Sequence, residues 1–224
     1  MDIRSRYLDA LGIEQWVARG DVALQPVESP PAVVAGWPDI ESAVAACTRC
    51  TLHAGRNRTV FGVGARNAEW MVIGEAPGAD EDRQGEPFVG RAGQLLDAML
   101  RAIGLPRDQV FIANVLKCRP PGNRDPEPEE VAACLPYLRR QIELVQPRIL
   151  LVVGRIAAQT LLATDAPIGK LRGQVHRFGD GRTPLVVTYH PAYLLRSPGE
   201  KRKAWEDLKL ARRVHRDGGG GDGG

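Results

Sequence analysis

The sequence predicts an α/β protein with a three-layer α/β/α arrangement, in which helices cover both faces of a central, mostly parallel four-stranded sheet. Two observations predict this class. Four short apolar runs lack the alternation of a half-exposed strand, as is typical of strands that are buried on both faces. A helical pattern of apolar residues follows each run, and strands that alternate with helices usually form parallel sheets. The 224 residues suffice for one such domain.

The expected strands and helices alternate from residue 70 onward. Strands are predicted at 70–73, 110–113, 149–153 and 185–188, and helices at 94–103, 131–145, 156–162 and 201–214. Each strand is a run of Val, Ile, Leu, Met or aromatic residues, and each helix repeats its apolar residues at intervals of three and four. The glycine-rich segment from Gly74 to Gly93 carries Asp80, Glu81 and Asp82, and we expect it to be an open loop.

The two ends of the chain differ from this middle part. Residues 3–19 have the apolar spacing of a short amphipathic helix, and residues 21–38 contain four prolines that disfavour a regular element. The last residues are mostly glycine. We therefore expect an N-terminal helix and Pro-rich linker at 1–38, a folded domain at 39–216 and a flexible Gly-rich tail at 217–224.

The charge is distributed unevenly along the chain. The formal net charge is +3, but residues 41–216 carry +8, because residues 1–40 carry −3 and residues 217–224 carry −2. A basic domain favours contact with phosphate, although a solvated basic face without a partner has the same composition. No apolar run approaches the ~18 residues of a membrane span, and no secretory signal is recognisable, so we expect no membrane contact and a cytoplasmic location.

The four cysteines are candidate metal ligands, because disulfides are unexpected in a reducing compartment. Two residues separate Cys47 from Cys50, so both thiolates can reach one iron or zinc, whereas fifteen residues separate Cys118 from Cys134. Structural zinc usually has two tight pairs, and the open second pair therefore favours an iron–sulfur cluster over zinc. The alternative is that Cys118 and Cys134 are small buried apolar residues.

Polar side chains follow the four predicted strands, where open parallel sheets bind their ligands. Glu75, Asn114, Arg155 and His190 stand at these four places. A side-chain amide can read the edge of a base, and Phe88 in the glycine-rich loop can stack on a base or anchor the loop. The glycines after the first strand fit neither a P-loop nor G-x-G-x-x-G, which disfavours a nucleoside triphosphate or a dinucleotide.

Four motifs together carry a resemblance. They are Gly-Glu-Ala-Pro-Gly at 74–78, Pro-Phe-Val-Gly-Arg-Ala-Gly at 87–93, Asn-Val-Leu-Lys-Cys-Arg-Pro-Pro at 114–121 and His-Pro-Ala-Tyr-Leu-Leu-Arg at 190–196. With the four cysteines, they resemble the family 4 uracil-DNA glycosylases, the iron–sulfur branch of that superfamily, over about residues 39–214. The resemblance implies the fold of that superfamily. It also implies an enzyme that flips deoxyuridine out of DNA and hydrolyses its N-glycosidic bond, starting base excision repair.

The resemblance also implies roles for individual residues. As catalytic residues, Glu75 would position or polarise the attacking water, and His190 would donate to the base carbonyl oxygen where negative charge gathers. The implied substrate-binding residues are Ala76, Glu81, Phe88 and Asn114. Among these, Phe88 would stack on the uracil and Asn114 would bind its edge, while Glu81 would help to hold the base or the loop. Ala76 leaves no acidic side chain where other branches keep an aspartate.

The remaining implications concern DNA, the cluster and partners. The implied DNA-binding residues are Arg155, Leu194, Leu195 and Arg196. The two leucines would enter the duplex as a wedge; the alternative is that both leucines are core residues. We expect one of the two leucines to be in the core. The implied ligands of a 4Fe-4S cluster, more structural than redox-active, are Cys47, Cys50, Cys118 and Cys134. We expect a monomer that acts on uracil-containing single- or double-stranded DNA, and residues 3–19 are a candidate docking site for a protein partner.

Three alternatives compete with this function. One relative bonds covalently to abasic DNA through a histidine, but residues 119–133 contain no histidine. Another branch with broader base specificity has an apolar residue in place of Glu75. The third alternative is a non-catalytic Fe-S or zinc DNA-binding module associated with a polymerase or a repair complex. Such a binder has no need for Glu75, Asn114 and His190 together.

Overall fold

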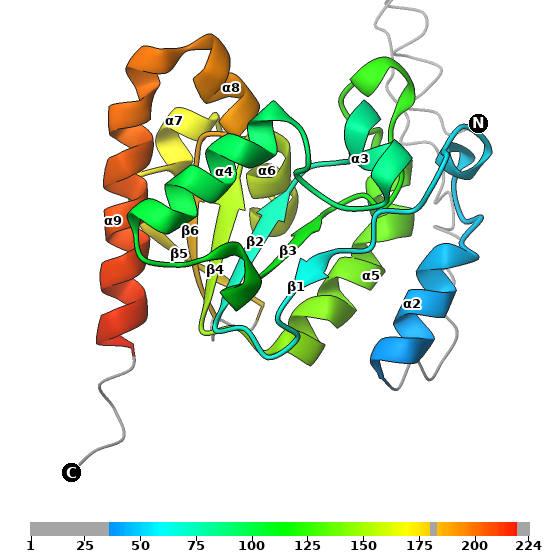
Figure 1. Cartoon of the computed structure of the whole chain (residues 1–224), viewed down its shortest axis with the longest axis horizontal. Helices are drawn as coiled ribbons and strands as arrows, with labels where there is room; N and C mark the ends of the chain where they lie inside the picture. Colours follow the sequence, from blue (N-terminus) through cyan, green and yellow to red (C-terminus); the bar gives the residue numbers. More distant parts are fainter. Residues whose placement is uncertain (1–35, 180–182, 219–224) are drawn as a thin grey trace, which may run out of the picture. The chain divides into compact units, whose positions relative to one another are not determined.

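The computed structural model describes residues 36–179 and 183–218, and their helices and strands alternate along the chain (Figure 1). The strands are β1 (Val63–Gly64), β2 (Trp70–Gly74), β3 (Val110–Asn114), β4 (Ile149–Val153), β5 (Val175–Phe178) and β6 (Thr183–Thr188). The α-helices are α2 (Trp37–Ala45), α3 (Ala79–Gln84), α4 (Arg91–Ala102), α5 (Pro128–Val145), α6 (Arg155–Leu162), α7 (Ile168–Leu171), α8 (Pro191–Arg196) and α9 (Lys201–Asp217). The predicted helix at 3–19 lies outside the described residues.

The sheet has the strand order β1-β3-β2-β4-β6-β5. The four predicted strands form its parallel centre, and the class is confirmed, but the predicted count of four strands is wrong. β1 and β5 add an antiparallel strand at each edge. Neither edge strand is an apolar run: β1 has two residues, and the side chains of β5 alternate between exposed and half-buried. Neither edge strand therefore has the buried apolar run by which the four central strands are predicted.

Helices cover both faces of the sheet, which has two hydrophobic cores (Figure 1). Along β2, Met71 and Ile73 face the core that contains side chains of α2, α5 and α6, while Trp70 and Val72 face the core with α4, α8 and α9. Every residue of β2, β3 and β4 is buried, because successive side chains point to opposite faces and both faces are covered. This burial explains the unbroken apolar runs.

Two helices occur where a linker or a loop was predicted. α2 begins at Trp37, inside the predicted linker, and Pro38 is compatible because the first turn of a helix needs no N–H donor. α3 occupies part of the expected open loop; its first turn is acidic, which suits the helix dipole, and it ends at Gly85 with φ of 81°. The prediction of a purely open loop is wrong, because glycines and acidic residues occur in loops but here flank and begin a short helix.

The order of the strands separates two loops at the carboxyl edge of the sheet. β2 and β4 are neighbours, and the chain leaves β2 toward β3 but leaves β4 toward β6. The loops that follow β2 and β4 therefore diverge at the carboxyl edge, which is where open α/β sheets bind ligands. Within residues 36–179 and 183–218, no helix is long and apolar enough to cross a membrane.

Candidate active site

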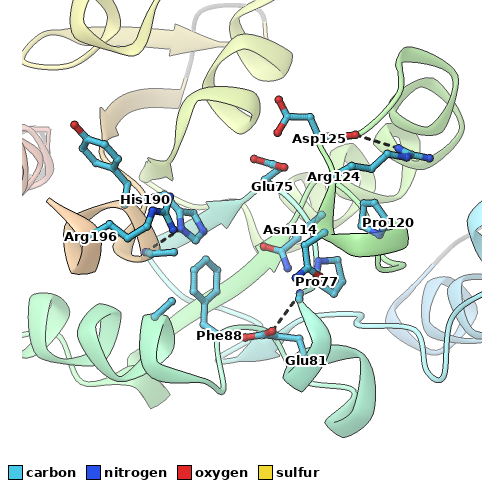
Figure 2. Close-up of a pocket in the computed structure, with 16 residues that line it drawn as sticks. Glu75, Pro77, Glu81, Phe88, Asn114, Pro120, Arg124, Asp125, His190 and Arg196 are labelled. Atoms are coloured by element: carbon cyan, nitrogen blue, oxygen red, sulfur yellow. Dashed lines mark hydrogen bonds between the residues drawn. The ribbon is translucent and has the colours of Figure 1, made fainter.

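A cleft of about 420 Å³ lies at the carboxyl edge of the sheet. Loops after β2, β3 and β6 and the first turns of α3, α4 and α8 supply its walls (Figure 2). Its lining residues are Glu75, Ala76, Pro77, Gly78, Glu81, Phe88, Ala92, Asn114, Pro120, Asn123, Arg124, Asp125, His190, Ala192, Tyr193 and Arg196. The cleft thus gathers seven of the ten predicted catalytic, substrate-binding and DNA-binding residues.

The first wall is the turn after β2, which carries Glu75 and Ala76. Glu75 is half-buried, and the pKa of its carboxyl is raised to about 7. Burial is the main cause, the negative charge of Asp125 adds to it, and the charge of Arg155 opposes it. The carboxyl group therefore changes its charge near neutral pH. Ala76 adds an apolar surface beside it. Such a half-buried carboxyl can orient a water or stabilise a nearby cation.

Asn114 ends β3 with a buried side chain that is only 2% exposed. Its Oδ1 is buried and accepts no hydrogen bond from any residue in the described part of the chain. A buried acceptor without a donor costs free energy, so this atom is suited to a donor that a ligand supplies. The approach of Asn114 requires glycine on β2, because a Cβ on Gly74 would lie 2.4 Å from Oδ1.

Phe88 lies beside Asn114 and is 6% exposed. Its φ of 55° is unusual for a bulky residue and is a strained conformation. Two glycines accommodate it: a Cβ on Gly74 would lie 2.7 Å from the tip of the phenyl ring, and a Cβ on Gly93 would lie 1.8 Å from the Phe88 carbonyl oxygen. The surrounding backbone therefore fixes the ring as a flat apolar wall of the cleft.

His190 caps the N-terminus of α8 and faces the cleft (Figure 2). Its Nδ1 accepts a hydrogen bond of 3.1 Å from the N–H of Ala192. Burial, together with a smaller effect of the charge of Arg196, lowers the pKa of the imidazole to about 4. At neutral pH the ring is therefore uncharged, and because Nδ1 is an acceptor its one proton is on Nε2. His190 offers the cleft a neutral N–H donor.

Glu81 binds backbone and holds two loops together. One carboxylate oxygen accepts from the N–H of Gly78 at 3.1 Å, and the other accepts from the N–H of Val89, also at 3.1 Å. These bonds join the turn after β2 to the segment that carries Phe88. Of the two roles expected for Glu81, this geometry supports holding the loop.

The predicted DNA-binding residues divide into three groups. Arg196 is exposed and lines the cleft. Arg155 begins α6 outside the cleft lining, and its guanidinium pairs with Asp125 at 2.6 Å. Leu195 is half-buried, whereas Leu194 is 1% exposed and belongs to the core with α4 and α9. The prediction that Leu194 contacts DNA is therefore corrected: it is the core leucine of the pair.

The prediction from sequence missed two features of the cleft. Tyr193 lines it and is 37% exposed. Its spacing of three residues from both His190 and Arg196 indicates a shared helix face and could have revealed it. Arg124 also lines the cleft, and its two terminal nitrogens, Nη1 and Nη2, donate to the carboxylate of Glu130 at 2.9 and 2.6 Å. No motif pointed to this pair.

The four cysteines line one second pocket, together with Arg56 and Lys117. Cys47 and Cys50 follow α2, Cys118 follows β3 and Cys134 lies on α5. The Arg56 guanidinium donates to Cys118 Sγ at 3.2 Å, and the Lys117 N–H donates to Cys134 Sγ at 3.2 Å. The side chains within the described ranges form no group of three or more ligands at the distances of a single metal ion.

The chemistry of this second pocket suits a metal centre. Burial raises the pKa values of Cys50 and Cys118, and raises that of Cys134 to about 12. Thiolates at these buried positions therefore require nearby positive charge, which a bound metal centre provides. The N–H donors on two of the sulfurs are the contacts that thiolate ligands accept. A cluster suits ligands from separate segments better than one ion does.

The sequence of this chain is similar to those of known proteins. Residues 61–209 match the family model described as the uracil DNA glycosylase superfamily. A type-4 uracil-DNA glycosylase of Archaeoglobus fulgidus is 44% identical over 76% of this chain and 89% of its own. One from Sulfurisphaera tokodaii is 43% identical over 78% of this chain and 83% of its own, and one from Thermotoga maritima is 40% identical over 77% and 91%.

Proposed function

The chain belongs to the uracil DNA glycosylase superfamily and to its type-4 branch, and from this premise we propose that it excises uracil from DNA. It flips a deoxyuridine into the cleft, hydrolyses the N-glycosidic bond and leaves an abasic site, the first step of base excision repair. The observation that carries the proposal is the unpartnered Asn114 Oδ1 in the same cleft as the neutral N–H donor of His190.

Asn114 reads the base. Its Oδ1 accepts the N3–H of uracil, and its Nδ2 donates to the O4 carbonyl, so the amide and the base edge are complementary. Cytosine presents an acceptor at N3 and a donor at C4, and both would oppose the like group of this amide. Phe88 supplies the apolar face on which the flipped base stacks.

His190 stabilises the departing base. As the glycosidic bond breaks, negative charge gathers on the uracil, and Nε2–H donates a hydrogen bond to its O2 carbonyl. The neutral ring is suited to this role because its donor is already oriented by the Ala192 N–H. Removal of one such donor from an active site typically costs ~3–4 kcal/mol of transition-state stabilisation.

Glu75 acts on the sugar side. In its ionised form the carboxylate orients the attacking water and stabilises the oxocarbenium-like sugar, whose positive charge develops as the base leaves. The pKa of about 7 leaves a large fraction of the carboxyl groups ionised at neutral pH. The Asp125–Arg155 pair at 2.6 Å is a second electrostatic influence on this carboxyl.

The cysteine pocket suits a 4Fe-4S cluster that Cys47, Cys50, Cys118 and Cys134 would hold. The four cysteines line one pocket, and two of their sulfurs accept hydrogen bonds from N–H groups. When bound, the cluster cross-links the segments around α2, β3 and α5. Excision of uracil transfers no electrons, so we assign the cluster a structural role. Protein purified without air is expected to absorb near 400 nm; zinc in place of iron would contradict this assignment.

Arg196 and Arg155 are proposed to bind backbone phosphates, and Leu195 remains the candidate wedge. The substrate is uracil-containing DNA, single- or double-stranded, and we propose that the protein acts as a monomer in the cytoplasm. There the reducing conditions keep the four thiols free for a metal. Residues 3–19 remain a proposed docking segment for a protein partner.

An excision assay tests the function. Full-length protein is incubated with labelled oligonucleotides that contain one uracil or, as a control, cytosine or thymine at the same position, and alkali then cleaves the strand at abasic sites. Cleavage at uracil alone is expected. If protein with a full complement of iron binds the oligonucleotide but produces no abasic site, the chain is the non-catalytic binding module instead.

A further inference from the structure

Lys117 is a buried lysine that the proposed mechanism does not use. It follows β3 and is 2% exposed. Its ammonium donates to the carbonyl oxygen of Asn114 at 2.8 Å and to Oε1 of Gln141 at 2.6 Å. Burial of an ammonium group costs free energy that an apolar side chain of the same length would not incur, so it calls for an explanation beyond the filling of space.

The acceptor on α5 is itself oriented. Gln141 is fully buried, and its Nε2 donates to the carbonyl oxygen of Phe61 at 2.9 Å. With its donor side committed to Phe61, the amide must present Oε1 to Lys117. The ammonium is therefore held between two fixed acceptors, one on α5 and one at the end of β3.

The main chain of Lys117 is fixed as well. Its N–H donates to Cys134 Sγ at 3.2 Å, and its carbonyl oxygen accepts from the N–H of Val60 at 2.8 Å. The side chain of the same residue returns to Asn114, three positions earlier. Lys117 thus makes direct contacts with both the cysteine pocket and the residue that faces the cleft with an unpartnered acceptor.

We propose that Lys117 is a positioning residue for base recognition: its ammonium holds the Asn114 carbonyl, and with it the side-chain amide that reads the base, at a fixed place relative to the cysteine pocket. This inference rests on the proposed function. Lys117 does not touch the base; it acts through Asn114. Backbone hydrogen bonds hold the same segment in addition to Lys117: the N–H groups of Val115 and Leu116 donate to the carbonyls of Gly74 and Glu75, both at 3.0 Å.

The positioning role predicts a specific result for the variant Lys117→Met, whose unbranched side chain is one atom shorter and makes neither hydrogen bond. A small displacement of a positioned group can cost about 10²-fold in rate. We expect single-turnover uracil excision at saturating enzyme to fall by about this factor, with DNA affinity and the absorbance near 400 nm retained. Lys170→Met, which alters an exposed lysine on α7, is the matched control and should change none of these.

A double-mutant cycle with Asn114→Ala separates positioning from a merely structural role. If Lys117 acts through Asn114, then Lys117→Met should reduce excision much less in the Asn114→Ala background than in the wild type. Gln141→Leu removes one acceptor of the ammonium but keeps the lysine. It should reduce the excision rate less, with the same dependence on Asn114, and it replaces Lys117→Met in the test if that variant does not fold.

The outcomes are distinct. Wild-type protein that leaves uracil in place refutes the proposed function itself. Active wild-type protein together with wild-type rates in the folded lysine and glutamine variants overturns the positioning role. The role is also overturned if Lys117→Met reduces the excision rate equally with and without the Asn114 side chain. It is overturned as well if the reduction only matches the fraction of protein that is unfolded in a thermal melt. A loss that depends on Asn114 supports the proposal.

Discussion

The imidazole of His190 lies against the phenyl ring of Phe88, with ring centroids 5.6 Å apart and 29° between the ring planes. The apolar ring excludes water from one face of the imidazole, and such desolvation disfavours the charged form. Phe88 therefore helps to keep the neighbouring donor neutral, in addition to the base-stacking role that we propose for it.

Replacement of Phe88 by alanine is expected to raise the pKa of His190 from about 4 toward its ordinary value of 6.5, because the imidazole becomes hydrated. The titration of the imidazole carbon signals in an NMR spectrum measures this change. Arg196→Gln serves as a comparison, since the arginine charge also lowers the pKa but is the smaller cause. A larger shift in the arginine variant than in Phe88→Ala would contradict this order of causes.

His190→Ala is expected to slow uracil excision by about 10²–10³-fold, the usual loss when one donor to a developing negative charge is removed. DNA affinity should change little, because in the proposed mechanism the imidazole contacts the base and no phosphate. Single-turnover rates and a separate binding titration measure the two effects. Equal losses of rate and affinity would show that His190 binds DNA generally instead of stabilising the transition state.

The pH dependence of excision should follow the charge of Glu75. In the proposed mechanism the ionised carboxylate is the active form. Its pKa is raised to about 7, so the rate should increase with pH below 7 and level off above it. Single-turnover rates between pH 5.5 and 9 would trace this curve. Glu75→Gln should be slow and should not show this increase. A wild-type rate that is constant across pH 7 would argue against a catalytic carboxylate.

Gly74→Ala adds a single methyl group, which would lie 2.4 Å from Asn114 Oδ1 and 2.7 Å from the Phe88 ring. Both side chains would have to move, and a displacement of this size is expected to reduce excision by about 10²-fold. Gly169→Ala on α7 is the matched control, because its added methyl group meets no atom within 4 Å. Comparable losses in the two variants would refute a local cause.

Arg196→Gln should weaken DNA binding and lower the slope of log affinity against log salt by about 1, as expected when one phosphate contact is lost. Arg196 is exposed and makes no ion pair within the described part of the chain, whereas Arg155 is already paired with Asp125. Arg155→Gln is therefore expected to change the slope less. A larger change in the Arg155 variant would reverse this order.

The fold was predictable to the extent that burial leaves a mark on composition. β4 is buried along its whole length, and its predicted bounds agree with the structure. β5 borders solvent and was missed, because a half-exposed edge strand carries polar residues such as His176 and Arg177. α3 was missed for a different reason: six residues with three acids resemble a polar loop unless the capping role of Glu81 is recognised.

The site was predictable where parallel strands bring residues together. Glu75, Asn114 and His190 follow or end strands whose carboxyl ends share one edge, and the cleft contains all three. For residues on a helix, the orientation of the helix about its own axis decides which side chains face the cleft. Leu194 and Tyr193 are neighbours in sequence, yet one is in the core and the other borders the cleft, because adjacent residues on a helix point about 100° apart. The packing of α8 was needed to tell them apart.

The walls of the cleft depend on three residues that have no side chain. An added Cβ on Gly74, Gly93 or Gly154 would approach Asn114, Phe88 or His190, respectively. A methyl group at any of these places would push a cleft residue out of its position. In a library of random substitutions selected for repair, these three glycines should therefore tolerate as few replacements as the residues that perform the chemistry, although they contribute no functional group.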